Sequence, residues 1–252
     1  MDVSNSSEGF PEDEGSEPVL MHAAVAGAFR ALNASGMTWM LLRGENDLLR
    51  PSGDITLLVD AANPSLLDEL MSRIGFRRVH AAGYGSHRFY FTYVGQTWVK
   101  LDIVSEISFG PFQQWRTTLA PDCLSRRKQI GVLWLPASAD QAWLQLLHLF
   151  LDKGKMSPEQ FETAAVAGAI ASADDEIAEF VDCHMGWGTA DALLDLVAAE
   201  RWEEIPAFAA RMARAYTAAQ PVGARLRSVT NRILRLSGVK VEGPVVVREV
   251  KR

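Results

Sequence analysis

The segment LLRGENDLLRPSGDITLLVD, residues 41–60, decides the expected fold. One apolar run ends at Arg43, a polar loop follows, and a second apolar run begins after Gly53 and Asp54. Side chains alternate along a strand, so Asp54 and Thr56 share one face at a spacing of about 7 Å. A carboxylate in a buried strand is costly unless it is paired, hydrogen-bonded or bound to metal. Asp54 is therefore a candidate ligand.

A second acid stands inside an apolar strand in VKLDIV, residues 99–104. The same alternation puts Lys100 and Asp102 on one face and directs the residues between them into the core. If this strand neighbours the one that begins at Asp54, the two acids converge on one hard cation such as Mg²⁺. That ion prefers carboxylate oxygens and keeps water and phosphate as its other ligands.

The segments around these two strands predict a mixed α/β arrangement. Asn63 is a plausible N-cap for a helix that ends near Gly75, and Pro64 suits its first position. Two strands separated by Gly95 and Gln96 indicate a hairpin. The expected elements are a helix at 22–36, strands at 38–44 and 54–60, a helix at 63–75, a short strand at 76–80, and strands at 86–94 and 97–107.

After Pro136 the sequence indicates helices only. The segments beginning at Ser138 and Ser157 each place Gln three residues later, which is the arrangement of a capping box. Three further helices are expected at 189–199, 202–217 and 222–236. The predicted fold class is thus α/β (α+β), a mixed-sheet domain followed by an all-helical domain. The expected division is a disordered acidic lead at 1–19, the sheet domain at 20–136, the helical domain at 137–236 and a basic tail at 237–252.

Composition and charge limit the classes of partner. Residues 221–252 carry eight Lys/Arg against two Glu, a charge of +6, which leaves −12 for residues 1–220 out of the total of −6. The basic end could contact an acidic partner or be a solvated helix face or linker. An acidic body without a basic stripe argues against a nucleic-acid partner. No apolar run is long enough to span a bilayer and the N-terminus lacks signal-peptide features, so we expect a cytoplasmic protein with no membrane partner.

The order of these motifs resembles a known superfamily. The sequence resembles the polymerase-beta-like nucleotidyltransferase superfamily, and its small bacterial members in particular. The resemblance rests on a strand ending in an Arg-Gly turn, a short loop, GDITLLV, a helix ending in Gly-Phe and a later strand with KLDIV. The resemblance covers about residues 22–155 and implies the nucleotidyltransferase-like sheet fold followed by a helical bundle.

The resemblance also implies a function and a set of site residues. Asp54 and Asp102 would be the catalytic acids that bind Mg²⁺, and Arg43 and Gly44 would contact the phosphates of a nucleoside triphosphate such as ATP. The neighbouring Gly53 and Thr56, with Arg88 and Lys153, complete the candidate substrate-binding set. The implied reaction is transfer of a nucleotidyl group to a hydroxyl of a small molecule or a protein.

Thr56 departs from the family pattern, which is Asp-x-Asp where this chain has Asp-x-Thr. A neutral hydroxyl is a weaker ligand, so a two-ion site loses one bridging charge. Glu45 or Asp47 in the preceding loop could supply the missing carboxylate. The alternative is a non-catalytic member of the same fold that binds a nucleotide or a protein.

Several candidates have ordinary structural explanations as well. Exposed arginines such as Arg88 are commonly solvated, and Lys153 suits the C-terminal end of its helix. His87 follows a Gly-rich loop and could face the pocket or the solvent, and His148 could be a core residue or a catalytic one. We expect the pocket between the sheet and the helices that begin at Ser138, with Asp54, Arg43, Arg88 and Lys153 facing it.

Overall fold

The computed structural model describes residues 20–60, 63–81, 85–110, 113–153, 156–172 and 175–236. The acidic lead at 1–19 and the tail at 237–252 lie outside this part of the chain, so the predictions about them stay predictions.

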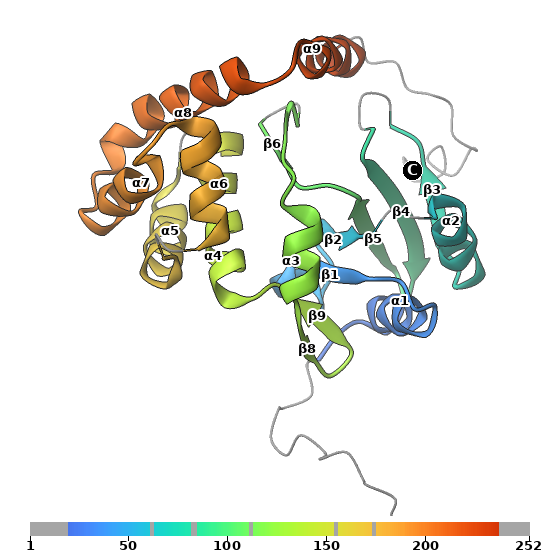
Figure 1. Cartoon of the computed structure of the whole chain (residues 1–252). Coiled ribbons are helices and arrows are strands. Elements are labelled where there is room, and N and C mark those ends of the chain that lie inside the picture. The colour runs from blue at the N-terminus through green and yellow to red at the C-terminus, as the bar shows by residue number, and fades with distance from the viewer. Residues whose placement is uncertain are drawn as a thin grey trace, which may run out of the picture.

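A five-stranded mixed sheet forms the first half of the molecule (Figure 1). The strand order is β1-β2-β5-β4-β3, with β2 and β5 parallel and the other neighbours antiparallel. The strands are β1 (Trp39–Arg43), β2 (Ile55–Val59), β3 (Arg77–Val79), β4 (His87–Val94) and β5 (Thr97–Val104). The predicted mixed α/β sheet is confirmed, and the pair that carries the two acids is adjacent.

One face of the sheet is covered by α1 (Ala23–Ala34) and α2 (Pro64–Arg73). Phe29 of α1 stacks on Trp39 at a centroid distance of 4.9 Å, and the odd-numbered residues of β2 pack into the same core. The predicted cap of α2 is confirmed, because the Asn63 side chain accepts from the backbone N–H of Leu66 at 3.1 Å. This layer orients the opposite face of β2 and β5 toward the helices that follow.

The other face packs against the C-terminal helices, through a core that Leu58 of β2 and Val104 of β5 share with them. These helices are α3 (Ala120–Arg126), α4 (Ser138–Leu147), the π-helical turn η2 (His148–Lys153), α5 (Pro158–Ile170), α6 (Glu176–Met185), α7 (Thr189–Ala198) and α8 (Ile205–Ala219). The last described helix, α9 (Val222–Leu236), follows α8, and none of the described buried core residues belongs to it. There are also two short helical turns, η1 (Glu45–Asp47) and η3 (Trp202–Glu204). Two small antiparallel pairs complete the described elements: β6 (Ser108–Phe109) with β7 (Trp115–Arg116), and β8 (Lys128–Ile130) with β9 (Leu133–Leu135).

The two expected capping boxes have different outcomes. At α5, the Gln160 side chain accepts from the backbone N–H of Ser157 at 2.8 Å, as predicted. At α4 the prediction is wrong, because Ala137 is the N-cap and Gln141 donates to Glu45 instead. No helix in the described ranges is long and apolar enough to cross a bilayer.

Candidate functional site

Thr56 and Asp102 lie side by side on the sheet face that the helices cover. The parallel register pairs Thr56 of β2 with Asp102 of β5, and both residues are buried. Leu58 and Val104, which share their face by strand alternation, contact the helical core. The sequence-based prediction of a shared polar face between these two strands is thereby confirmed.

Asp102 is hydrogen-bonded by His87. The Nδ1 atom of His87 lies 2.7 Å from Oδ1 and 3.0 Å from Oδ2 of the carboxylate, and both side chains are largely buried. The burial cost of the carboxylate is thus offset by a charge-assisted hydrogen bond. His87 also lines a cavity, so the alternative in which it faces a pocket is the correct one.

Asp54 takes a different partner and a different environment. Its Oδ1 atom lies 2.6 Å from Nζ of Lys100, and about half of its side chain is exposed. The Lys100 ammonium also lies over the rings of Phe89 and Phe91, 5.2 Å and 5.9 Å from their centroids. The expectation that the helices cover Asp54 is wrong, because the helical layer covers the sheet nearer the C-terminal ends of β2 and β5.

A cavity of about 900 Å³ lies between the sheet and the helices, and we call it the helix-side cavity. Its position confirms the predicted pocket between the sheet and the helices that begin at Ser138. Sheet residues at its wall include Leu42, Arg43, His87 and Val104. The helical wall comes from α4, η2 and α5, with the β6 segment closing one side.

Asp54 and Gly53 line a second cavity of about 1190 Å³, which we call the strand-end cavity. It lies toward the other end of the same strands, and Lys100 and Trp98 belong to its lining. The structure therefore divides the predicted site. Arg43 and Lys153 lie at one cavity, Asp54 and Gly53 at another, and the buried Thr56–Asp102 pair lies in the sheet between them.

Arg43, His148 and Asp152 form a polar cluster at the helix-side cavity. The Nη1 atom of Arg43 lies 2.6 Å from Nδ1 of His148 and 3.9 Å from Oδ2 of Asp152. Asp152 also contacts Nδ1 of His148 and accepts from the backbone N–H of Gly110. The π-helical turn η2 presents His148, Asp152 and the cavity-lining Lys153, and such turns occur frequently at functional sites.

The electrostatic surroundings of His148 favour its neutral form. Burial lowers the pKa of His148, and the positive charges of Arg43 and Lys153 lower that pKa further, while Asp152 opposes them. Nδ1 accepts from Arg43 when the ring proton is on Nε2, and it donates to Asp152 in the other tautomer. The neutral ring can therefore accept a hydrogen bond from Arg43 or donate one to Asp152, and a ligand that binds Arg43 would favour the second arrangement.

The described lining of the helix-side cavity has more acids than bases. Its carboxylates are Glu45, Glu106, Asp152, Glu159 and Glu162, and its arginine and lysine are Arg43 and Lys153. Arg116 pairs with Glu106 at 3.0 Å, and Arg43 with Asp152. A polyanion that enters without a cation meets net repulsion here.

Arg88 lies on the opposite face of the sheet, so its expected place at the pocket is wrong. Its register partner is Ile103, and its Nη1 atom donates to Asp68 of α2 at 2.9 Å. Asp68 also accepts from Tyr90 and Arg78. Burial raises the pKa of Asp68, but these partners outweigh burial and lower it overall.

The two acids of the loop before β2 have different partners. Asp47 closes the loop by accepting from the backbone N–H groups of Ser52 and Gly53 at 3.1 Å and 2.9 Å. Glu45 accepts from Gln141 at 3.0 Å and lines the helix-side cavity, as His87 does. Asp47 is thus engaged within its own loop, and Glu45 as a replacement for the missing acid stays a prediction.

The backbone conformation at position 44 requires glycine. Its φ of 100° is strained for other residues, and a methyl group there would meet the carbonyl oxygen of Asp54 at 2.8 Å. The turn between β1 and η1 is thus pressed against the start of β2. This close approach explains the glycine without reference to a ligand.

The residues expected to hold Mg²⁺ are Asp54 and Asp102. The neutral Thr56 is the register partner of Asp102, and both acids have nitrogen partners, Lys100 and His87, with which an ion would compete. Within the described ranges, no three His, Cys, Asp or Glu side chains are grouped so that they could hold a metal ion. A two-ion centre of the family type does not fit these residues.

Comparisons of the chain with family models, with curated proteins and with solved structures find no match in any of the three.

Proposed function

We propose that this chain binds a nucleoside triphosphate as its magnesium complex and transfers the nucleotidyl group to a hydroxyl of a small molecule or a protein, with pyrophosphate as the leaving group. The observation that carries the proposal is the adjacency of Thr56 in β2 and Asp102 in β5, on the sheet face whose further members Leu58 and Val104 contact the helices. This arrangement agrees with the one that the motifs GDITLLV and KLDIV imply.

The cavity supports a division of roles among the described residues. Arg43 and Lys153 offer positive charge to the phosphates from the sheet and from η2, respectively. Asp54 and Asp102 would hold the Mg²⁺ ion, which would supply charge neutralisation at the transferring phosphoryl group. Because the remaining lining is acidic, a bare triphosphate is disfavoured and its magnesium complex is the expected ligand.

His87 would act on the acceptor side. Its hydrogen bond to Asp102 fixes the ring orientation, and the residue lines the helix-side cavity. An imidazole held in this way can take the proton of an acceptor hydroxyl. The apolar residues Val166 and Ile170 of α5 offer a wall for the acceptor at the same cavity.

A second candidate is a non-catalytic nucleotide- or protein-binding member of the fold. The specific observation in its favour is that Lys100 holds Asp54 while the neutral Thr56 stands next to Asp102. An ammonium beside the first acid supplies positive charge without a metal ion. In this case nucleotide binding would not depend on Mg²⁺.

Isothermal titration of ATP with and without Mg²⁺ tests both candidates. The enzyme proposal expects Mg²⁺-dependent binding that Asp54→Ala weakens at least tenfold and that Asp60→Ala leaves unchanged. Asp60 is the matched control because it is an exposed acid at the far end of the same strand. Binding that ignores Mg²⁺ and survives Asp54→Ala supports the second candidate, and absence of nucleotide binding leaves only a protein-binding role.

Lys153→Ala separates the helix-side cavity from the strand-end cavity as the phosphate site. The proposal expects weaker ATP binding in Lys153→Ala and unchanged binding in Lys128→Ala, a control lysine that is exposed on β8. Unchanged affinity in both variants would remove the helix-side cavity from the proposal. A mass-spectrometric screen of acceptors with all four triphosphates then identifies the product.

A further inference from the structure

The last described helix, α9, has an apolar stripe that is open to solvent. Val222, Leu226, Val229 and Ile233 recur at spacings of four, three and four residues, which places them on one side of the helix. Each is 54–71% exposed. The stripe runs for about 17 Å along the helix axis.

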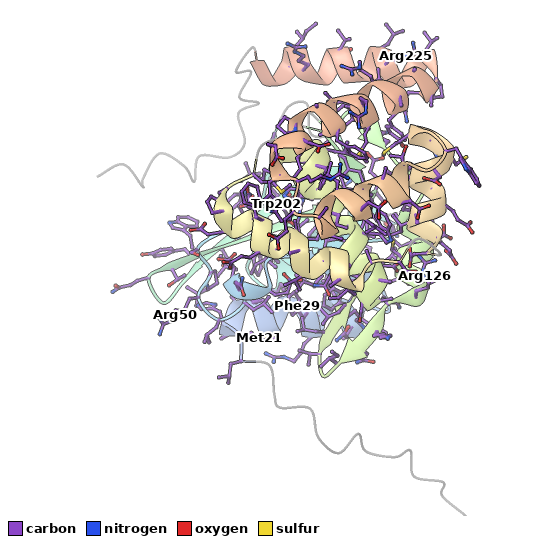
Figure 2. The ribbon with its side chains drawn as sticks, turned by 90° about the vertical axis from the view of Figure 1, so that its left-hand side faces the viewer. Met21, Phe29, Arg50, Arg126, Trp202 and Arg225 are labelled. Carbon is purple, nitrogen blue, oxygen red and sulfur yellow. The ribbon has the colours of Figure 1, made fainter. Side chains whose placement is uncertain are left out.

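The position of α9 separates this stripe from the rest of the molecule. In Figure 1, α9 lies at the edge of the molecule beyond α8. Figure 2 shows it as the outermost helix at one end, with Arg225 labelled on it. Arg225 donates to the carbonyl oxygens of Ala218 and Gln220, which anchors the start of α9 to the end of α8.

The charge of α9 is entirely positive. Its fifteen residues include four arginines, at positions 225, 227, 232 and 235, and no Asp or Glu. Arg225 and Arg232 are exposed together with the stripe. A helix with an exposed apolar stripe, several arginines and low overall hydrophobicity has the pattern of helices that lie in the plane of a membrane surface.

We propose that α9 docks the protein on an anionic lipid surface, with the stripe in the headgroup region and the positive charge of the helix close to the lipid phosphates. This inference is independent of the proposed nucleotide chemistry. A surface contact needs no spanning helix, so it is compatible with the finding that no described helix can cross a bilayer.

Two features favour a lipid surface over a protein partner. Pairing of α9 with α9 of a second copy would bring eight arginines together without a compensating acid in either helix, which opposes self-association. The four arginines of α9, without an acid in the helix, also match the negative surface of an anionic membrane, where each basic residue near the surface contributes about 1 kcal/mol. Repulsion between the acidic body and the lipid is screened beyond about 8 Å at physiological salt.

Co-sedimentation of the full chain with vesicles tests the proposal. Vesicles of phosphatidylglycerol mixed equally with phosphatidylcholine should bind the protein, and pure phosphatidylcholine vesicles should bind it at least tenfold less. Binding should weaken as salt is raised. The double substitution Leu226→Ser with Ile233→Ser should reduce binding about tenfold or more, because two apolar side chains that would be buried in the lipid are lost. Arg232→Gln should reduce it about fivefold.

The matched control is Leu49→Ser with Leu66→Ser, two exposed leucines outside α9 whose loss should leave vesicle binding unchanged. Equal binding to both vesicle types, or equal loss in the control and the α9 variant, overturns the proposal. A concentration-dependent dimer in analytical ultracentrifugation that the α9 variant abolishes, without phosphatidylglycerol binding, also overturns it and assigns the stripe to a second copy.

Discussion

The substitution Thr56→Asp creates the Asp-x-Asp pattern of the superfamily that the sequence resembles, and it tests the geometry of the sheet site. Thr56 and Asp102 are register partners and are only 3% and 6% exposed. Neighbouring strands lie about 5 Å apart, so the new carboxylate would face that of Asp102 at about this distance. At an effective dielectric constant of about 20, the repulsion amounts to about 3 kcal/mol. We expect the free energy of unfolding to fall by about this amount at pH 7 without Mg²⁺.

The pH dependence of the Thr56→Asp variant follows from the same repulsion. Burial and the charge of Asp102 raise the pKa of the introduced carboxyl above its unfolded value. The folded state then binds more protons than the unfolded state, so the loss of stability vanishes below about pH 4 and grows as pH rises. For a protein of this size, 3 kcal/mol corresponds to a fall in Tm of about 6–12 °C.

Thermal and urea unfolding of the Thr56→Asp and Thr56→Asn variants between pH 4 and pH 8 measures this effect. The Asn variant matches Asp in size and lacks the charge. If the carboxylates hold Mg²⁺, the ion should stabilise the Asp variant more than the Asn variant, because the Asp variant adds a charged oxygen ligand to Asp54 and Asp102. An ion that binds the folded state alone adds about 2.7 kcal/mol at one hundred times its Kd. Equal unfolding free energies of the two variants across this pH range without Mg²⁺ would refute the placement of Thr56 beside Asp102.

Three further predictions concern other contacts. Arg126→Ala should lower the free energy of unfolding by about 3–5 kcal/mol in urea, because it leaves the fully buried Asp140 without its 2.8 Å partner; a loss under 1 kcal/mol would contradict this. Gly44→Ala should lower the free energy of unfolding by about 2 kcal/mol or more. Gly27→Ala, whose added methyl group would lie in open space on α1, should leave that free energy unchanged or raise it. The pKa of His148 is lower in the folded state than in the unfolded state, so the wild-type protein should lose stability as the pH falls from about 6.5 through the folded pKa. The His148→Gln variant should lack this pH dependence when unfolding by urea is measured at successive pH values.

Local sequence patterns predicted the five strands of the main sheet and the turn between β4 and β5, but not the short strands β6 to β9 or helix α3. The two-residue turn at Gly95 and Gln96 has positive φ at both positions, 59° and 64°, as a tight hairpin between twisted strands requires. Helix α6 was missed, although Asp175 caps it by accepting from the backbone N–H of Ile177 at 2.8 Å. That Asp-based cap is a local signal, and it was available in the sequence.

The wrong placement of Arg88 was also avoidable from local information. A two-residue turn after Val94 pairs that residue with Thr97, and counting back along the hairpin sets Arg88 opposite Ile103 rather than on the face of Asp102. Strand alternation then sends Arg88 away from the acids. The partner on the far face, Asp68 of α2, could not be inferred in this way, because no local rule states which helix covers that face.

The amino-acid sequence by itself determined the five strands of the main sheet, the caps of α2 and α5 and the alternation that puts Thr56 on the face of Asp54, because these depend on neighbours a few residues apart. Tertiary structure alone decided the parallel pairing of β2 with β5, the partners Lys100 and His87 of the two acids, and the division of the site between two cavities. It also brought Arg43 to His148, which is 105 residues away along the chain. Such contacts depend on how the helical layer packs over the sheet, and that packing is set by the summed burial of many side chains rather than by any one motif.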